Sequence, residues 1–394
     1  MESGTQQLVM VANARIPSQR AQSLQVMHAG QAFVGQGLRT TLLHAKRRDT
    51  TPLSAPALAS YYGLPSDSAL GIRAVDCFDA IDRVPRSLQF VPARLQEWTF
   101  ASRAARSVDA EFPGAWVVTR EIECAFRMAP RPGIFWEVHR VPGGRWRRAL
   151  MAKALPKIAG VIAISGGVRD DLIGLGVPES KIFVEHDAFD FTRFDAMPSK
   201  QTAREMLGLD AKAHWVVYTG GLLAWKGVEI LVQAAEQLPD VEFAIVGGMD
   251  ADVQRIQLMA KDLPNVKVLG FQAPGQVPLY LAAADLGIVP NRSQPAISSR
   301  YTSPLKIFEA MATALALVVS DLPSMRDIVG DHEVCFVPPD DATALAGGIR
   351  RVLGDTNLCK DLGQRLSERA PQHTFDARAA RILTWMSSRL PKTQ

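Results

Sequence analysis

The most informative stretch of the sequence is WVVYTGGLLAWKG, residues 215–227. Its apolar start, residues 215–218, predicts a buried strand, because bulky and β-branched residues suit a pleated surface covered on both sides. Gly220 and Gly221 then allow the backbone to turn and to approach a ligand closely. Lys226 precedes a helical pattern. A cation and backbone N–H groups are therefore expected at the mouth of a strand–loop–helix unit, where phosphates bind.

This stretch matches neither common nucleotide-binding motif. It lacks the G-x-x-x-x-G-K-[ST] of a P-loop and the G-x-G-x-x-G of a dinucleotide site. A lysine that only caps a loop is the alternative interpretation of Lys226.

A second segment, RYTSPLKIFEAMA at residues 300–312, precedes a strand-like run at 316–320. Pro304 fits the first turn of a helix, where its missing N–H would be unpaired in any case. Lys306 and Glu309 are three residues apart and so share one face of that helix. A carboxylate beside a phosphate site would repel the phosphate unless it binds sugar hydroxyls. The alternative is an ordinary Lys–Glu pair on the surface.

Together the two segments resemble the C-terminal half of the family-4 glycosyltransferases (glycosyl transferases group 1), which have the GT-B fold and use nucleotide-sugar donors. The pattern Y-x-G-x-L-x-x-x-K-G matches residues 218–227, and the glutamate-bearing helix matches 303–312. Further likeness occurs at residues 13–18, 25–27, 135–139, 161–165 and 316–323. The resemblance implies an α/β chain with two Rossmann-like, doubly wound parallel-sheet domains that face a central cleft.

The alternation of short apolar runs with helical stretches is typical of parallel α/β units. We expect an N-terminal, acceptor-side domain at 1–190 and a nucleotide-sugar-binding domain at 191–374, with a helix at 375–390 that packs back on the first domain. Residues 50–103 show no clear period and are interpreted as loops and helices at a domain edge. Strands are expected at residues 8–11, 39–43, 115–118, 134–137, 161–164, 182–184, 215–218, 242–246, 266–269, 286–289 and 317–319.

The implied activity is that of a retaining, hexosyltransferase-type enzyme in polysaccharide, glycolipid or glycoconjugate assembly. Its acceptor would be a saccharide or a lipid-linked molecule. The leaving diphosphate gains negative charge, so preorganised cations and N–H donors carry most of the chemistry. Lys226, His139 and Glu309 are the candidate catalytic residues. The candidate donor-binding residues are Gly220, Gly221, Lys226, Phe271, Gln272, Ser303, Pro304, Leu305, Lys306 and Glu309. Arg20, Ser23 and Arg120 are the candidates for the acceptor side.

Two positions depart from the family pattern. Many relatives have an arginine where this chain has Gly221, and a glutamate where it has Tyr301. A nucleotide-sugar epimerase of the same fold and a non-catalytic, glycosyltransferase-like partner subunit therefore stay open as alternatives.

No metal or other cofactor is expected. Asp250-Ala251-Asp252 imitates the D-x-D metal motif of the other glycosyltransferase fold, but it follows Gly247-Gly248, where relatives have a glycine-rich turn. The four cysteines show no C-x-x-C spacing, which argues against a zinc site or a disulfide framework.

The bulk properties indicate a two-domain globular protein. The 394 residues exceed one typical core, and the 47% apolar and 21% charged content disfavours long disorder. A formal charge of +4 is too small to indicate nucleic-acid binding. No apolar run reaches the length of a membrane span, so we expect a cytoplasmic location.

A basic stretch at residues 145–157 suggests peripheral contact with an anionic membrane at its inner face, with Trp146, Leu150 and Leu155 interleaved among the cations. A solvated helix face is the alternative. Membrane contact would favour a lipid-linked acceptor.

Overall fold

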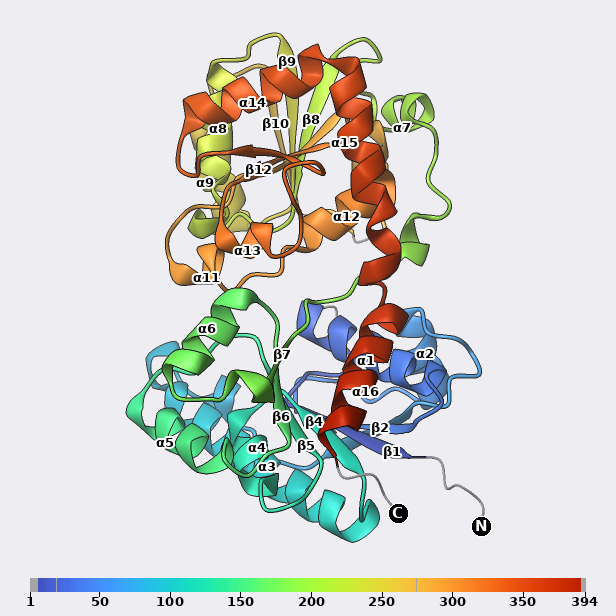
Figure 1. Ribbon diagram of the computed structural model, residues 1–394. Coiled ribbons are helices and arrows are strands. Elements are labelled where there is room, and N and C mark those ends of the chain that lie inside the picture. The colour runs from blue at the N-terminus through green and yellow to red at the C-terminus, as the bar shows by residue number, and fades with distance from the viewer. Residues whose placement is uncertain (1–5, 19, 274, 391–394) are drawn as a thin grey trace. The chain divides into compact units, whose positions relative to one another are not determined.

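The computed structural model describes residues 6–18, 20–273 and 275–390 (Figure 1). The chain divides into two compact units of α/β structure. The first unit comprises Met1–Ile164, Val168–Glu185 and Phe375–Gln394, and the second comprises Ser165–Gly167 and His186–Thr374.

The first unit contains a parallel sheet of seven strands in the order β3-β2-β1-β4-β5-β6-β7. Its strands are β1 (Gln7–Ala12), β2 (Arg39–Ala45), β3 (Gly71–Val75), β4 (Trp116–Thr119), β5 (Ile134–Val138), β6 (Gly160–Ala163) and β7 (Ile182–Val184). Its helices are α1 (Ala21–Gly35), α2 (Ala55–Tyr62), α3 (Phe90–Glu111), α4 (Ile122–Met128), α5 (Arg145–Ala154), α6 (Gly166–Gly174) and α16 (Phe375–Arg389).

The second unit contains a parallel sheet of six strands in the order β10-β9-β8-β11-β12-β13. Its strands are β8 (His214–Thr219), β9 (Val241–Val246), β10 (Val266–Gly270), β11 (Leu286–Val289), β12 (Leu317–Ser320) and β13 (Cys335–Val337). Its helices are α7 (Lys200–Leu207), α8 (Val228–Glu236), α9 (Asp250–Met259), α10 (Val277–Ala283), α11 (Ala296–Ser299), α12 (Leu305–Thr313), α13 (Pro323–Arg326), α14 (Ala342–Gly354) and α15 (Thr356–Glu368).

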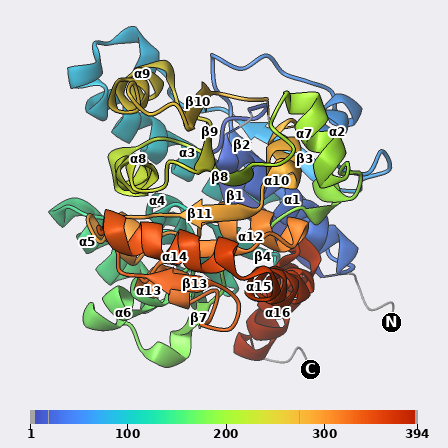
Figure 2. The same ribbon diagram turned by 90° about the horizontal axis from the view of Figure 1, so that it is seen from above.

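The central strand β8 shows why this sheet is covered on both faces. Val216 and Tyr218 pack in one core cluster with α8, α9 and α14. Trp215 and Val217 pack in another cluster with α10 and α12. The strands and helices concerned are labelled in Figure 2. Successive side chains of a strand point to opposite faces of the sheet, so an uninterrupted apolar run places apolar side chains on both faces and both are covered by helices.

The sequence prediction missed two short strands. β3 lies within residues 50–103, where we expected only loops and helices, and β13 was not expected. Both are edge strands, and Arg73 and Ala74 of β3 are exposed. The exposed residues of β3 interrupt the apolar pattern used to predict strands, and β13 has only three residues, too few to show one.

The C-terminal helix α16 is part of the core of the first unit. Ala379, Ile382 and Met386 are buried in one cluster with residues of α1 and of the sheet. A Cβ atom at Gly160 of β6 would lie 2.4 Å from Cη2 of Trp385, so the absence of a side chain there lets the indole lie on the strand.

Shortening Ile382 to alanine should lower the free energy of unfolding of the first unit by about 2–5 kcal/mol, because the side chain is buried and leaves a cavity. Urea denaturation followed by circular dichroism measures the change. Thr384→Ala is the control, since residue 384 is exposed on the same helix. Equal stability of the two variants would contradict the placement of α16.

Candidate active site

The strand order of the second sheet defines a crevice at the carboxyl end of β8. From β8 the chain builds β9 and β10 on one side and β11, β12 and β13 on the other. Open α/β sheets bind ligands at such a switch point, beyond the carboxyl ends of the strands. The loop after β8 and the start of α12 are therefore the candidate ligand-binding segments.

Glycines line this crevice because backbones approach closely there. Gly220 (φ 118°) donates its N–H to the Val246 oxygen at 2.8 Å. A Cβ at Gly247 (φ 116°) would lie 2.4 Å from the Gly220 oxygen. Gly227 (φ 73°) is pressed against β11, since its Cβ would lie 1.8 Å from the Pro290 oxygen. The turn that presents Lys226 thus requires glycine at its end.

Two lysines lie in the crevice, each over an aromatic ring. Lys226 Nζ is 3.9 Å from the centre of the Trp225 ring, and Lys306 Nζ is 4.5 Å from that of Tyr218. Within the described part of the chain, neither ammonium has a carboxylate within 4.0 Å. Burial and then the charge of Lys306 lower the pKa of Lys226 to about 6. Burial lowers the pKa of Lys306 to about 8, although Glu309 opposes this.

Glu309 of α12 reaches the same crevice. Its Oε2 accepts a hydrogen bond of 2.7 Å from the Thr219 hydroxyl at the end of β8. Burial raises the pKa of Glu309, against the opposing effects of Thr219, Lys306 and Arg193. Thr219 and Arg193 were not singled out from the sequence, because only the fold brings them to the glutamate.

The loop between β8 and α8 is held by two further side chains that the sequence analysis did not assign. The Tyr218 hydroxyl donates to the Gly221 oxygen at 2.6 Å. Arg255 of α9 donates to the Leu222 oxygen at 2.6 Å and pairs with Glu229. The arginine therefore contacts the loop one residue after Gly221.

The start of α12 offers donors to an anion. Pro304 immediately precedes the helix instead of lying in its first turn. The Ser303 hydroxyl is buried and has no hydrogen-bond partner in the described part of the chain. The first N–H groups of a helix, here from Leu305 and Lys306, lack partners within the helix and attract negative charge.

Phe271 and Gln272 follow β10 at the same edge of the sheet. The Phe271 ring is 69% exposed, and Gln272 Nε2 donates to the Leu269 oxygen at 3.0 Å. An exposed ring beside a polar amide is suited to a nucleobase.

In the first unit, His139 follows β5 and belongs to a charged network around Glu137. The buried Glu137 carboxylate contacts His139 Nε2 at 2.8 Å, Arg120 Nη2 at 2.7 Å and Arg378 Nη2 at 3.0 Å. Burial would raise the pKa of Glu137, but the charges of Arg120 and Arg378 and the hydrogen bond with His139 hold that pKa well below its usual range. Arg120, a candidate for the acceptor side, thus already has a carboxylate partner.

The other two acceptor-side candidates lie around the start of α1. Ser23 is 1% exposed, and its hydroxyl donates to the Arg15 oxygen at 2.7 Å, which fixes the loop after β1. Arg20 is exposed and forms no ion pair within the described residues.

The D-x-D string lies in the first turn of α9. Asp252 lies 3.5 Å from Arg255 of the same helix. Across residues 6–18, 20–273 and 275–390, no three His, Cys, Asp or Glu side chains are grouped as a metal site requires.

The basic stretch forms α5, but one expected apolar contact is wrong. Leu150 is only 6% exposed and belongs to the protein core, on a helix that packs against α4. Arg147 pairs with Glu97 and Glu123. Trp146 is 46% exposed, and Arg145, Arg148 and Lys153 are exposed. None of the described helices has the length and hydropathy that a bilayer span requires.

Comparisons with known proteins agree with this geometry. Residues 213–355 match the family model of the glycosyl transferases group 1. The putative teichuronic acid biosynthesis glycosyltransferase TuaC of Bacillus subtilis (strain 168) is 30% identical over 157 residues, which is 39% of this chain and 36% of that protein. The alpha-D-kanosaminyltransferase of Streptomyces kanamyceticus is 24% identical over 86% of this chain and 84% of its own. The alignments with the first curated relatives span well under half of those relatives' length.

Among solved structures, HepE from Anabaena in complex with UDP superposes with a TM-score of 0.73 at 17% identity, over 97% of this chain and 100% of its own. This likeness concerns the fold alone, and it covers both units. Residues 213–355 are therefore similar to the glycosyl transferases group 1 family, and the chain has the GT-B fold.

Proposed function

We propose that the protein is a retaining glycosyltransferase. It transfers a sugar from a nucleoside-diphosphate sugar to an acceptor hydroxyl in polysaccharide, glycolipid or glycoconjugate assembly. The observation that carries the proposal is the pair of partly buried lysines, Lys226 and Lys306, at the switch point of the second sheet; neither has an ion-pair partner among the described residues. The group 1 domain and the UDP found in the structure of HepE support it. A thermal-shift screen with UDP-, GDP- and ADP-sugars tests it, since a ligand that binds the native state raises its stability.

The donor diphosphate supplies the missing negative charge. Lys226 and Lys306 neutralise it, and the Ser303 hydroxyl and the N–H groups of Leu305 and Lys306 donate hydrogen bonds to it. As the glycosidic bond breaks, charge accumulates on the leaving phosphate and these interactions strengthen. The leaving phosphate then accepts the proton of the acceptor hydroxyl.

Glu309 binds the ribose hydroxyls, and Phe271 with Gln272 contacts the base. His139 is the candidate residue for contact with the donor sugar. Glu137 holds the His139 ring through Nε2 and so sets its orientation. Gly220 and Gly221 leave room for the diphosphate because neither carries a side chain.

Replacing Lys226 by alanine should lower turnover roughly a hundredfold or more, because a preorganised charge that stabilises the leaving group is lost. The rate of nucleoside-diphosphate release measures this. Lys267→Ala is the matched control, since Lys267 is an exposed lysine that also lies over an indole ring, that of Trp215. Similar rates for the two variants would refute the assignment.

Replacing Glu309 by glutamine should weaken UDP binding about tenfold or more, because hydrogen bonds to a charged acceptor are the stronger ones. The same variant should bind inorganic pyrophosphate at least as well as the unmodified protein does. Calorimetry separates the two contributions, since pyrophosphate has no ribose. An equal loss of affinity for UDP and for pyrophosphate would show that Glu309 supports the phosphate site instead.

Transfer should proceed without a divalent metal, because the two lysines supply the positive charge at the phosphate site. Activity in excess EDTA is then equal to activity in magnesium or manganese. Activity that disappears in EDTA and returns with either metal would contradict this part of the proposal.

The exposed face of α5 contacts an anionic membrane surface in this proposal. Arg145, Arg148 and Lys153 supply charge, at about 1 kcal/mol each, and Trp146 supplies apolar area. Co-sedimentation with anionic liposomes at low salt should fall when Arg148 and Lys153 are replaced by serine, while nucleotide binding is unchanged. A protein that never sediments with such liposomes has an ordinary solvated helix here.

A further inference from the structure

A second group of charged side chains lies at the carboxyl edge of the first sheet. Arg15 follows β1, Arg47 follows β2 and Asp79 follows β3, and these three strands are neighbours. The carboxyl ends of parallel strands meet at one edge, where such sheets bind ligands. None of these residues takes part in the donor chemistry proposed above.

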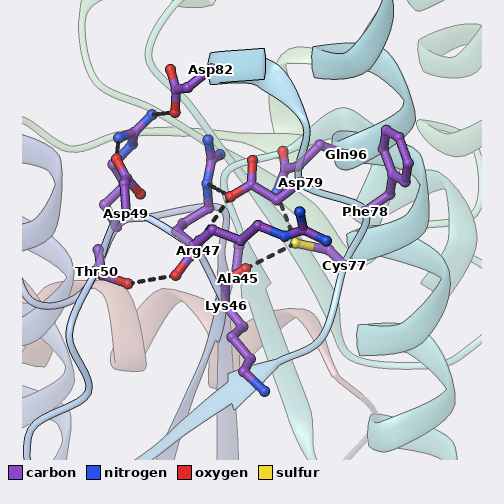
Figure 3. Close-up of polar contacts among 12 residues, drawn as sticks. Ala45, Lys46, Arg47, Asp49, Thr50, Cys77, Phe78, Asp79, Asp82 and Gln96 are labelled. Carbon is purple, nitrogen blue, oxygen red and sulfur yellow. Dashed lines mark hydrogen bonds and ion pairs between the residues drawn. The ribbon is translucent and has the colours of Figure 1, made fainter.

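Arg47 is the centre of this group (Figure 3). It is 8% exposed, and its Nε donates to Asp79 Oδ2 at 3.1 Å. The same Asp79 oxygen also accepts the Arg48 N–H at 2.9 Å, and Thr50 donates to the Arg47 oxygen at 2.9 Å. Both the side chain and the backbone of Arg47 are thus held in place.

One donor of the Arg47 guanidinium is not used. Its Nη2 is buried and has no hydrogen-bond partner within the described residues. Buried polar groups are almost always hydrogen-bonded, and a charged one has the strongest need of a partner. The contact with Asp79 therefore leaves one buried, charged donor of Arg47 without an acceptor among the described residues.

The unused donor of Arg47 favours an anion over a neutral partner. Burial lowers the pKa of Arg15, and the charges of Arg47 and Arg20 lower it further, against Asp82 and Asp79. Arg15 also pairs with Asp49, so three aspartates match the three arginines in formal charge. A sugar hydroxyl would satisfy Arg47 Nη2, but an anion gives this charged donor the stronger, charge-assisted hydrogen bond.

We propose that the acceptor carries an anionic group, a phosphate or a carboxylate, which Arg47 and Arg15 bind at the carboxyl edge of the first sheet. The proposal rests on the glycosyltransferase function argued above and names the class of acceptor. Asn13 and Gln96, which exchange two hydrogen bonds of 2.8 Å beside this group, form a neutral wall of the same edge.

Calorimetry on the full chain tests this with three probes: glucose 6-phosphate, glucuronate and glucose. At least one of the two anionic sugars should bind more tightly than glucose, and the comparison between them identifies the preferred anion. Arg47→Lys keeps a charge beside Asp79 but lacks the free Nη2 donor. It should weaken anion binding about tenfold or more, since the charge-assisted hydrogen bond from Nη2 is lost.

Two control variants locate the bound anion. Lys46→Met removes one charge from the adjacent residue, whose side chain is 61% exposed, and should leave binding unchanged. Lys306→Ala should also leave it unchanged, because Lys306 belongs to the donor site. If Arg47→Lys unfolds, the double change Arg47→Met with Asp79→Asn removes both buried charges together and replaces it.

Three results would overturn the proposal. They are equal affinity for glucose and its anionic forms, no binding of either anionic sugar, or a loss of anion binding in Lys306→Ala but not in Arg47→Lys. UDP is titrated into the same proteins. Absence of UDP binding with intact anion binding would count against the donor proposal alone, so the two failures are distinguishable.

Discussion

The donor crevice depends on one electrostatic conflict. Lys226 and Lys306 are partly buried, the charge of Lys306 lowers the pKa of Lys226, and no carboxylate within the described part of the chain forms an ion pair with either. Desolvation and a nearby like charge both disfavour an ammonium group. Protein interiors rarely keep such a cluster unless a ligand completes it. A diphosphate has the charge and the oxygen acceptors that would do so.

The backbone is arranged around that conflict. Gly220, Gly227 and Gly247 all have positive φ, and side chains at Gly227 and Gly247 would collide with neighbouring carbonyl oxygens. Glycine loses more conformational entropy on folding than other residues do, so these turns are unfavourable in that respect. In return, the backbone at the ends of the strands has no side chains to cover it beside Lys226 and Lys306. Tyr218 and Arg255 then hold the loop by its carbonyl oxygens, so that the crevice is formed before a ligand enters.

Most strands of the two sheets could be predicted from the sequence, because buried parallel strands appear as continuous apolar runs such as residues 215–218. The edge strand β3 could not, since half of it faces water and its composition resembles that of a loop. For the site, local spacing placed Lys306 and Glu309 on one helix face. It could not reveal Thr219 or Arg193, whose approach to Glu309 depends on tertiary packing. Leu150 was assigned to the surface because its basic neighbours in the sequence indicate an exposed helix and do not reveal which side of that helix is buried.

The central claim is that a nucleoside diphosphate provides the counter-charge for the two lysines. Calorimetry of UDP binding at about pH 7.5, in buffers of different ionisation enthalpy, measures the protons exchanged. Lys226, with a pKa of about 6, is mostly neutral in the free protein at this pH and must gain a proton to pair with the diphosphate. The account predicts net proton uptake, affinity that falls as pH rises, and a smaller uptake in Lys226→Ala. Binding with no uptake, or with proton release, would contradict it.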